Sequence, residues 1–228
     1  MIRNHLLIAL RSFRRSPLYF IINVTGFSLG LLACVLILRY VTYEYSYDEQ
    51  APEDIYRVTI HDRDAGLASS PVPTGPALVE ELSMASEFVR FAPLRGLIKP
   101  NAGSSGMTME HIVIGDGDFQ SFFGLKNMEG DVELMRQPGQ IFISQSLSKT
   151  LFKDESATGK EILLFESNFG EISLNIAGVY QDQPGNTHVP LAGIVSRPPL
   201  ELYNQQSFWA KTDNWGWNSF FTYVRLSS

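Results

Sequence analysis

Residues 18–38 of this 228-residue chain read LYFIINVTGFSLGLLACVLIL, and this stretch decides the architecture. It lies within 23 consecutive positions, residues 16–38, that carry no charged side chain. A helix rises about 1.5 Å per residue, so about 20 residues cross the roughly 30 Å hydrocarbon core of a bilayer. In lipid such a helix satisfies its own backbone, whereas in water it would expose apolar surface on every side. The stretch therefore predicts a transmembrane helix, which we assign to residues 17–43.

Charges are divided unequally between the two ends of the chain. All 24 Asp and Glu residues lie at or beyond Glu44, whereas the only charges in the first 39 residues are arginines. Because basic flanks remain in the cytoplasm, we expect a plasma (inner) membrane protein with a cytoplasmic N-terminus. Residues after about 48 are then extracytoplasmic. Beyond Arg39, 13 Lys and Arg stand against 24 acids, and this net charge of −11 argues against a nucleic-acid partner.

Residues 1–16 are predicted to form a cytoplasmic amphipathic helix. Apolar residues recur there at helical spacing, and Pro17 then interrupts the pattern. In this interpretation the polar side of the helix faces anionic lipid head groups, so membrane-surface contact is assigned to Arg3, Arg11, Arg14 and Arg15. The alternative is an ordinary basic flank of a membrane helix.

The predicted span contains a face of small residues. Gly26 and Gly30 have the spacing that lets a second helix approach closely, and Asn23 can hydrogen-bond across such a contact. We predict a helix-packing face made by Asn23, Gly26, Gly30 and Ala33, whose partner lies outside this chain. The alternative is that glycine is simply frequent in membrane helices.

A cleaved signal peptide is an alternative to a permanent span. Signal peptides have an apolar stretch of about 7–15 residues and a small-residue cleavage site. Here a longer stretch runs into Arg39 and a tyrosine-rich segment without such a site. Cys34 is followed by four apolar residues instead of the polar tether expected after a lipidated cysteine. It is the only cysteine, so an intrachain disulfide is excluded.

Residues 48–228 are predicted to form an α+β domain, because strand patterns alternate with helical ones. Strands are expected at residues 55–60, 87–94, 108–115, 140–144, 161–166, 172–180 and 219–226. Helices are expected at residues 77–85, 119–123, 145–152 and 198–206. The aromatic residues between positions 208 and 221 are expected to pack in the core, with a ligand groove as the alternative.

No motif for catalysis, metal binding or cofactor binding stands out, and we expect none. Asp116-Gly117-Asp118 lacks the further ligands of a calcium loop, and Thr158-Gly159-Lys160 lacks the upstream glycine of a phosphate loop. No metal-binding spacing links the scattered histidines, which are His5, His61, His111 and His188.

Five segments of the chain follow one another in a recognisable order. The first combines Asn23, Gly26 and Gly30 with Tyr47-Asp48 after the predicted span and the sequence IYRV at residues 55–58. The others are GDFQSFFGLKNMEGD (117–131), ISQSLSKTLFKDESATGK (143–160), NIAGVYQDQPGNTH (175–188) and WGWNSFFTYV (215–224). Together these segments resemble FtsX-like ABC transporter permeases of the MacB type. The resemblance implies that residues 48–228 form a MacB-like periplasmic core domain.

The resemblance further implies a permease subunit that is not itself an enzyme. A separate ABC ATPase subunit would hydrolyse ATP, and its motion would pass through the membrane helix to the periplasmic domain for export or mechanotransmission. The implied partners are the lipid bilayer, further permease transmembrane helices or a second permease copy in a dimer, and a periplasmic accessory protein.

Two departures from the family pattern affect these expectations. Arg39 and residues 40–45 are more polar than the family's usual exit from the membrane. The sequence also stops at Ser228, one strand after the Trp-Gly segment, so we expect an incomplete core domain and later membrane helices beyond it.

The main alternative function is a single-pass, membrane-anchored binding or sensor domain. A membrane-tethered hydrolase is disfavoured because the sequence offers no set of nucleophile and base. Further apolar runs encoded beyond Ser228, or a neighbouring gene for a Walker-A ATPase, would favour the permease.

Overall fold

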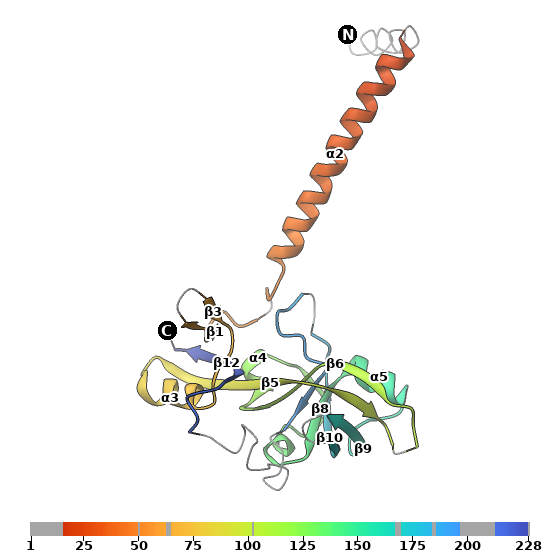
Figure 1. Ribbon diagram of the computed structural model, residues 1–228. Coiled ribbons are helices and arrows are strands. Elements are labelled where there is room, and N and C mark those ends of the chain that lie inside the picture. The colour runs from red at the N-terminus through yellow and green to blue at the C-terminus, as the bar shows by residue number, and fades with distance from the viewer. Residues whose placement is uncertain are drawn as a thin grey trace. The chain divides into compact units, whose positions relative to one another are not determined.

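The computed structural model describes residues 16–49, 51–62, 65–101, 103–166, 170–183, 186–196 and 213–227 (Figure 1). These residues belong to two compact units, Met1–Glu49 and Gln50–Ser228. Residues 1–15 of the predicted amphipathic helix, with Arg3, Arg11, Arg14 and Arg15, lie outside the described residues, as does the helix predicted at 198–206.

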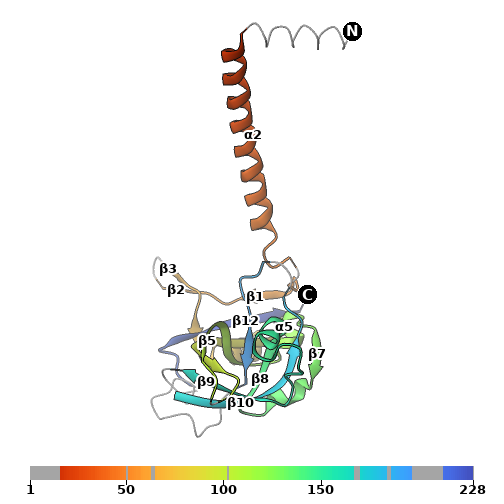
Figure 2. The same cartoon turned by 90° about the vertical axis from the view of Figure 1, so that its right-hand side faces the viewer.

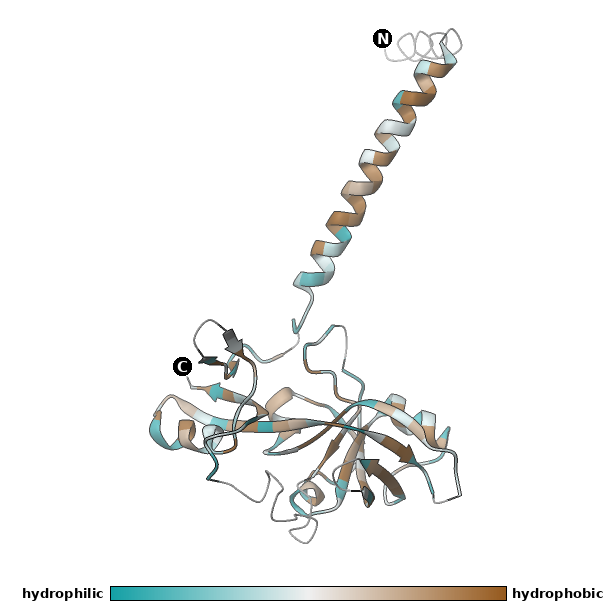
Figure 3. Cartoon of the chain, in the orientation of Figure 1, coloured by the Kyte–Doolittle hydropathy of each residue, from teal (hydrophilic) through white to brown (hydrophobic). Residues whose placement is uncertain are grey.

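The first unit contains one long helix, α2 (Pro17–Tyr45). Pro17 occupies its first turn, where the missing N–H costs no hydrogen bond. No residue of α2 is buried within the chain, and hydrophobic residues occupy most of its length (Figure 3). Among the described residues it is the one helix long and apolar enough to cross a membrane. An apolar helix is therefore present where the span was predicted at residues 17–43, and it extends to Tyr45; its insertion in a membrane stays a prediction.

The second unit is built around a closed ring of six strands. Each strand hydrogen-bonds to the next and the last returns to the first. In order around the ring the strands are β5 (Ala85–Lys99), β6 (Met107–Asp116), β11 (Gly193–Val195), β8 (Gln140–Ser144), β10 (Gly170–Tyr180) and β9 (Glu161–Glu166). Figure 2 labels four of them, β5, β8, β9 and β10. Two of the strand pairs, β6–β11 and β8–β10, run parallel, and the other four pairs are antiparallel.

Branched aliphatic side chains fill the space that these strands enclose. In β9, Ile162 and Leu164 are fully buried while Phe165 between two buried neighbours is exposed, as strand alternation requires. The same interior cluster contains Ile98, Ile112, Ile141, Ile143, Leu174 and Ile176. Closure leaves no open edge within the ring, and burial of these side chains holds the strands together.

Two ring strands extend past the ring and recruit further elements. The first half of β5 pairs with β12 (Asn218–Leu226), which also pairs with β1 (Ile55–Arg57) and β4 (Ser70–Pro71). The end of β10 pairs with β7 (Asn127–Gly130). The short helices are α3 (Thr74–Glu81), α4 (Phe119–Phe123), the 3₁₀ helix η1 (Val132–Arg136) and α5 (Gln145–Phe152).

Three sequence predictions differ from the structure by more than two residues at one end. The strand predicted at 87–94 is β5, which runs from Ala85 to Lys99. The single strand predicted at 55–60 is divided, because β1 pairs with β12 whereas β2 (Ile60–Asp62) forms a separate hairpin with β3 (Ala65–Leu67). The helix predicted at 77–85 is α3, which begins earlier and ends at Glu81 because Ala85 already belongs to β5.

The predicted aromatic core is present in part, and it also includes residues outside the 208–221 segment. Phe91 stacks on Tyr223 with ring centroids 5.8 Å apart, and Phe119 lies against Phe91 at 5.8 Å. From the 208–221 segment Phe220 is fully buried, but Trp215 and Trp217 are exposed, so the core prediction was wrong for these two. Both tryptophans lie just before β12 begins, and no described strand pairs with the chain at these two positions.

Tyr180 belongs to the same buried cluster as Phe91, Phe119 and Tyr223, and it provides a pH-dependent test of that cluster. Its hydroxyl donates to the backbone oxygen of Leu191 at 3.0 Å. Burial, with a smaller contribution from the Asp182 carboxylate, raises the pKa of the Tyr180 phenol far above its usual value of about 10. The folded state therefore favours the neutral phenol, and this stability is present below about pH 10 and is lost as the pH rises above it.

We expect Tyr180→Phe to lower the free energy of unfolding by about 1 kcal/mol at neutral pH, through the lost hydrogen bond. Urea unfolding at pH 7 and above pH 10 should show a larger alkaline loss for the wild type than for Tyr180→Phe. An equal alkaline loss in both proteins would contradict the assignment of this titration to Tyr180.

Candidate functional site

The predicted helix-packing residues share one face of α2. Successive residues of a helix turn by about 100°, so Asn23, Gly26, Gly30 and Ala33 fall on a single side. All four are exposed within the chain, and a Cβ atom added at Gly26 or Gly30 would meet nothing within 4 Å. Another helix can therefore approach this backbone closely. The packing role itself stays a prediction, because no described helix packs against this face.

Tyrosines concentrate at the C-terminal end of α2. Tyr43 and Tyr47 meet edge to face with ring centroids 5.5 Å apart, and their hydroxyls are 3.3 Å apart. Tyr40 and Tyr45 are exposed nearby. Amphipathic rings of this kind prefer the membrane–water interface, which agrees with the exit of a membrane helix at this point.

Arg225 ties the first residues of the second unit to its sheet. Its guanidinium lies 3.2 Å from Asp54, immediately before β1, and 2.5 Å from Glu87 on β5. It also donates to the backbone oxygen of Phe122 in α4 at 3.0 Å. One side chain on β12 thus links β1, β5 and α4, so displacement of β1 is opposed by contacts to three elements.

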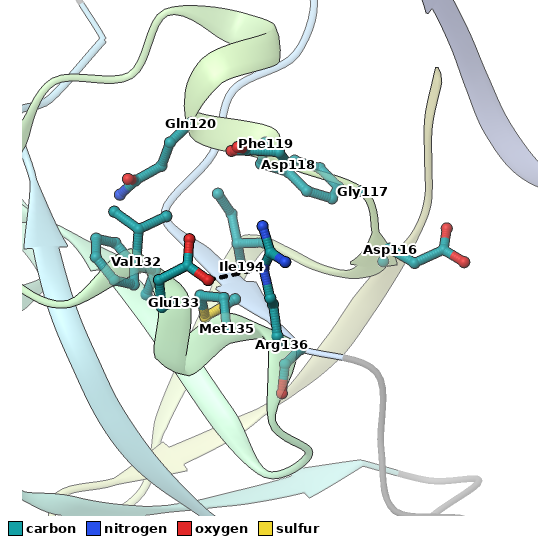
Figure 4. A pocket seen from close by; sticks show the side chains of 13 residues that line it. Asp116, Gly117, Asp118, Phe119, Gln120, Val132, Glu133, Met135, Arg136 and Ile194 are labelled. Carbon is teal, nitrogen blue, oxygen red and sulfur yellow. Dashed lines mark ion pairs between the residues drawn. The ribbon is translucent and has the colours of Figure 1, made fainter. Parts of the chain in front are cut away.

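A cavity of about 460 Å³ lies between η1 and α4 (Figure 4). Its inner wall is apolar and consists of Phe119, Phe142 and Ile194, all of which are buried. Its rim is polar and comes from residues 115–120, from η1 and from Ser196. A cavity of this size, apolar with a few polar groups, is typical of small-molecule sites.

Most charged groups at this cavity already have partners. Arg90 holds Asp116 in a two-point contact, with donor–acceptor distances of 2.9 and 2.7 Å. Asp118 accepts from the backbone N–H of Ser121 and so caps α4. Glu133 pairs with Arg136 at 3.0 Å across an exposed turn of η1.

The described residues offer binding surfaces but no recognisable reaction centre. Within the described parts of the chain, no three His, Cys, Asp or Glu side chains are grouped to hold a metal ion. The cavity was missed by sequence reasoning because its lining comes from four separate segments, and none of them carries a pattern that indicates a ligand.

Comparison with known proteins identifies a matching family and two solved structures with a similar fold. Residues 20–228 match the family described as the MacB-like periplasmic core domain. A domain of a putative permease protein from Porphyromonas gingivalis superposes with a TM-score of 0.63 at 21% identity, covering 78% of this chain and 77% of that one. The periplasmic region of MacB from Actinobacillus actinomycetemcomitans superposes with a TM-score of 0.53 at 14% identity, covering 79% and 78%. A comparison with curated protein sequences gives no significant match.

The family match starts inside α2 and continues through the whole second unit, including the six-stranded ring and β12. It covers far more than half of the sequence, and the two solved structures share the fold of the second unit at low identity. The chain therefore belongs to the family of the MacB-like periplasmic core domain.

Proposed function

We propose that this chain is the N-terminal part of a permease subunit of a MacB/FtsX-type ABC transporter. In this role α2 anchors the protein in the inner membrane, and the α+β unit works outside the cytoplasm. The observation that carries the proposal is that one family match includes both an apolar helix and the domain that follows it. Members of this family that have been solved include the periplasmic region of a MacB protein.

The connection between the two units suits the transmission of movement. Only residues 46–54 separate the end of α2 from β1. β1 pairs with β12, and Asp54 pairs with Arg225. A displacement of residues 46–54 therefore acts directly on β1 and β12 of the sheet. Short connections and ion-paired strand ends transmit displacement better than a long flexible linker would.

ATP hydrolysis is assigned to a separate ABC ATPase subunit on the cytoplasmic side. The basic segment with Arg3, Arg11, Arg14 and Arg15 is the part of this chain placed to meet that subunit and the inner lipid surface. The face of Asn23, Gly26, Gly30 and Ala33 is assigned to contact with further permease helices or with a second permease copy. A periplasmic accessory protein is the remaining proposed partner.

Reporter fusions test the proposed orientation. Alkaline phosphatase fused after residue 227 is expected to be active, because this enzyme folds only outside the cytoplasm. A fluorescent protein fused before Met1 is expected to be fluorescent. The reversed pattern, or a soluble product without detergent, would sink the assignment of α2 as a membrane anchor with a cytoplasmic N-terminus.

Co-purification tests the proposed permease role against that of an anchored sensor domain. The full permease is expected to retain an ABC ATPase subunit from the same genome in mild detergent. Replacing Arg11, Arg14 and Arg15 with glutamate should reduce that retention at least tenfold, because charge reversal disfavours both the ATPase and the inner lipid surface. Arg136→Glu in the second unit serves as the matched control and should retain the ATPase. An ATPase that never co-purifies would favour the sensor domain.

A further inference from the structure

One cation lies where the apolar run of α2 ends. Arg39 directly follows Leu38, and it is the only Lys or Arg between Arg15 and Arg57. It lies 22 residues after Pro17, which places it about 33 Å farther along the helix axis. A hydrocarbon core is roughly 30 Å thick, so Arg39 reaches one boundary of that core when Pro17 lies at the other.

The Arg39 side chain is exposed and forms no ion pair or hydrogen bond with any described residue. The nearest acid in the sequence is Glu44, which instead accepts a hydrogen bond from Tyr40. Residues five apart on a helix differ by about 140° around its axis, so Glu44 does not face Arg39. The guanidinium therefore presents its five N–H donors to whatever surrounds α2 at this level.

Arg39 lies on the side of α2 opposite the small-residue face. It follows Gly30 by nine residues, and nine steps of about 100° make two and a half turns. Tyr43 lies one turn farther along the same side. Leu32 and Val35 precede Arg39 there, and they are 54% and 52% exposed. When the face that contains Gly30 packs against another helix, the side with Arg39 is left to lipid.

Phosphate groups are the anions that surround a helix at this level of a bilayer. An arginine within hydrocarbon is costly, whereas one at the boundary extends its apolar stem and places the guanidinium among the head groups. Phosphate oxygens accept two-point contacts from the planar guanidinium, and the opposite charges strengthen each hydrogen bond. Figure 3 shows the hydrophobic part of α2 giving way to hydrophilic residues toward its C-terminal end.

We propose that Arg39 binds the phosphate of a phospholipid in the extracytoplasmic leaflet and so fixes the depth of α2 in the membrane. The guanidinium donates to two phosphate oxygens, and the Tyr43 ring lies one turn farther along, where aromatic side chains favour the interface. This inference rests on the membrane span and orientation of the proposed function, to which it adds a lipid ligand and the residue that binds it.

Loss of this contact should let α2 sink toward the cytoplasm. Without the Arg39 charge, the uncharged run would extend from Ser16 to Tyr43, which is longer than the about 20 residues that a bilayer needs. Movement in the other direction would draw Arg15 into hydrocarbon, which is costly. Cys34, five residues before Arg39, should therefore move toward the centre of the bilayer.

The depth of Cys34 in vesicles that contain the full chain tests this proposal. Cys34 is the only cysteine and is exposed on α2, so a bimane label attached to it reports on one position. Two uncharged quenchers, the methyl esters of 5-doxylstearate and 12-doxylstearate, sample a shallow and a deep level. The ratio of shallow to deep quenching is measured in phosphatidylcholine and in digalactosyldiacylglycerol, whose sugar head group carries no phosphate.

In phosphatidylcholine, Arg39→Met is expected to lower the shallow-to-deep ratio about twofold, because the charge no longer holds this end of α2 at the head groups. Arg39→Lys keeps a cation that reaches phosphate and should stay close to the wild type. Arg95→Met removes an exposed arginine of the second unit, and as the matched control it should leave the ratio unchanged. In the galactolipid, the difference between wild type and Arg39→Met should shrink by at least about half, because sugar hydroxyls carry no charge.

A wild-type ratio for Arg39→Met in phosphatidylcholine would overturn the proposal. An equally large difference in both lipids would also overturn it, because hydration or a protein partner would then hold Arg39 in place of phosphate. A label quenched by neither ester would contradict the membrane span, and with it the proposed function. A label that is quenched but insensitive to Arg39→Met overturns only the lipid contact, so the two failures are distinguishable.

Discussion

Arg90→Met is expected to lower the free energy of unfolding of the extracytoplasmic unit by about 3–5 kcal/mol. Arg90 and Asp116 are direct partners across β5 and β6, and their side chains are only 8% and 23% exposed. Arg90 also donates to the backbone oxygen of Val72. Removing the guanidinium leaves the Asp116 carboxylate without its counter-charge in a site largely shielded from water, which is far costlier than losing an exposed pair.

The matched control is Arg136→Met, which breaks the ion pair with Glu133 where both side chains are largely exposed, at 78% and 69%. Its cost should be under about 1 kcal/mol because water and salt screen exposed charges. Urea unfolding of the full chain in detergent, followed by circular dichroism of the sheet, measures both variants. The double variant Arg90→Met/Asp116→Leu should recover much of the loss, because it removes the uncompensated carboxylate. Equal effects of Arg90→Met and Arg136→Met would contradict this account.

Gly130→Ala is expected to destabilise the same unit by about 2–5 kcal/mol. Gly130 ends β7 with a φ of +92°, a conformation that costs other residues about 1–2 kcal/mol. It also lies directly opposite Gly178 of β10. A Cβ atom at Gly130 would overlap the Ala177 carbonyl oxygen and the Gly178 Cα atom, and these backbone atoms cannot move without disturbing the ring. Overpacking adds about 1–3 kcal/mol.

Gly124→Ala separates the backbone conformation from the crowding. Gly124 ends α4 with a φ of +65°, but a Cβ atom there would meet nothing within 4 Å. It should therefore cost only the conformational part, about 1–2 kcal/mol. Unfolding midpoints of the two variants, measured side by side, test the difference. If Gly124→Ala were as damaging as Gly130→Ala, the close approach of β7 and β10 would not be the cause.

The local elements that the sequence predicts correctly are those whose pattern is complete within one segment. The run at residues 18–38 is long and apolar enough to specify α2 without reference to any other part of the chain. The alternation in β9 and the helix at 145–152 are equally local; in the structure Ser144 caps this helix by accepting from the N–H of Leu147 three residues later. The family resemblance of residues 48–228 depends on such segments occurring in order, and the family match confirms it.

Other features depend on which segments become neighbours in space. β9 pairs with both β10 and β5, and this second pairing closes the ring, but the alternation within β9 is the same for an open sheet. Trp215 and Trp217 are exposed although their residue type favours burial, because burial depends on what covers a strand end. Arg90 and Asp116 become a pair only through the register of β5 and β6.

The sequence by itself determined that this protein has a helix long and apolar enough to cross a membrane, followed by an α+β domain of the MacB-like family. Both conclusions rest on hydrophobic length, charge asymmetry and the order of local motifs, which need no knowledge of long-range contacts. Only the tertiary structure decided that six strands close into a ring, that Arg225 links β1 to β12, and that Gln120 and Arg136 face one cavity. These features arise from strand register and loop placement, which are set by the packing of the whole domain and leave no pattern in any single segment.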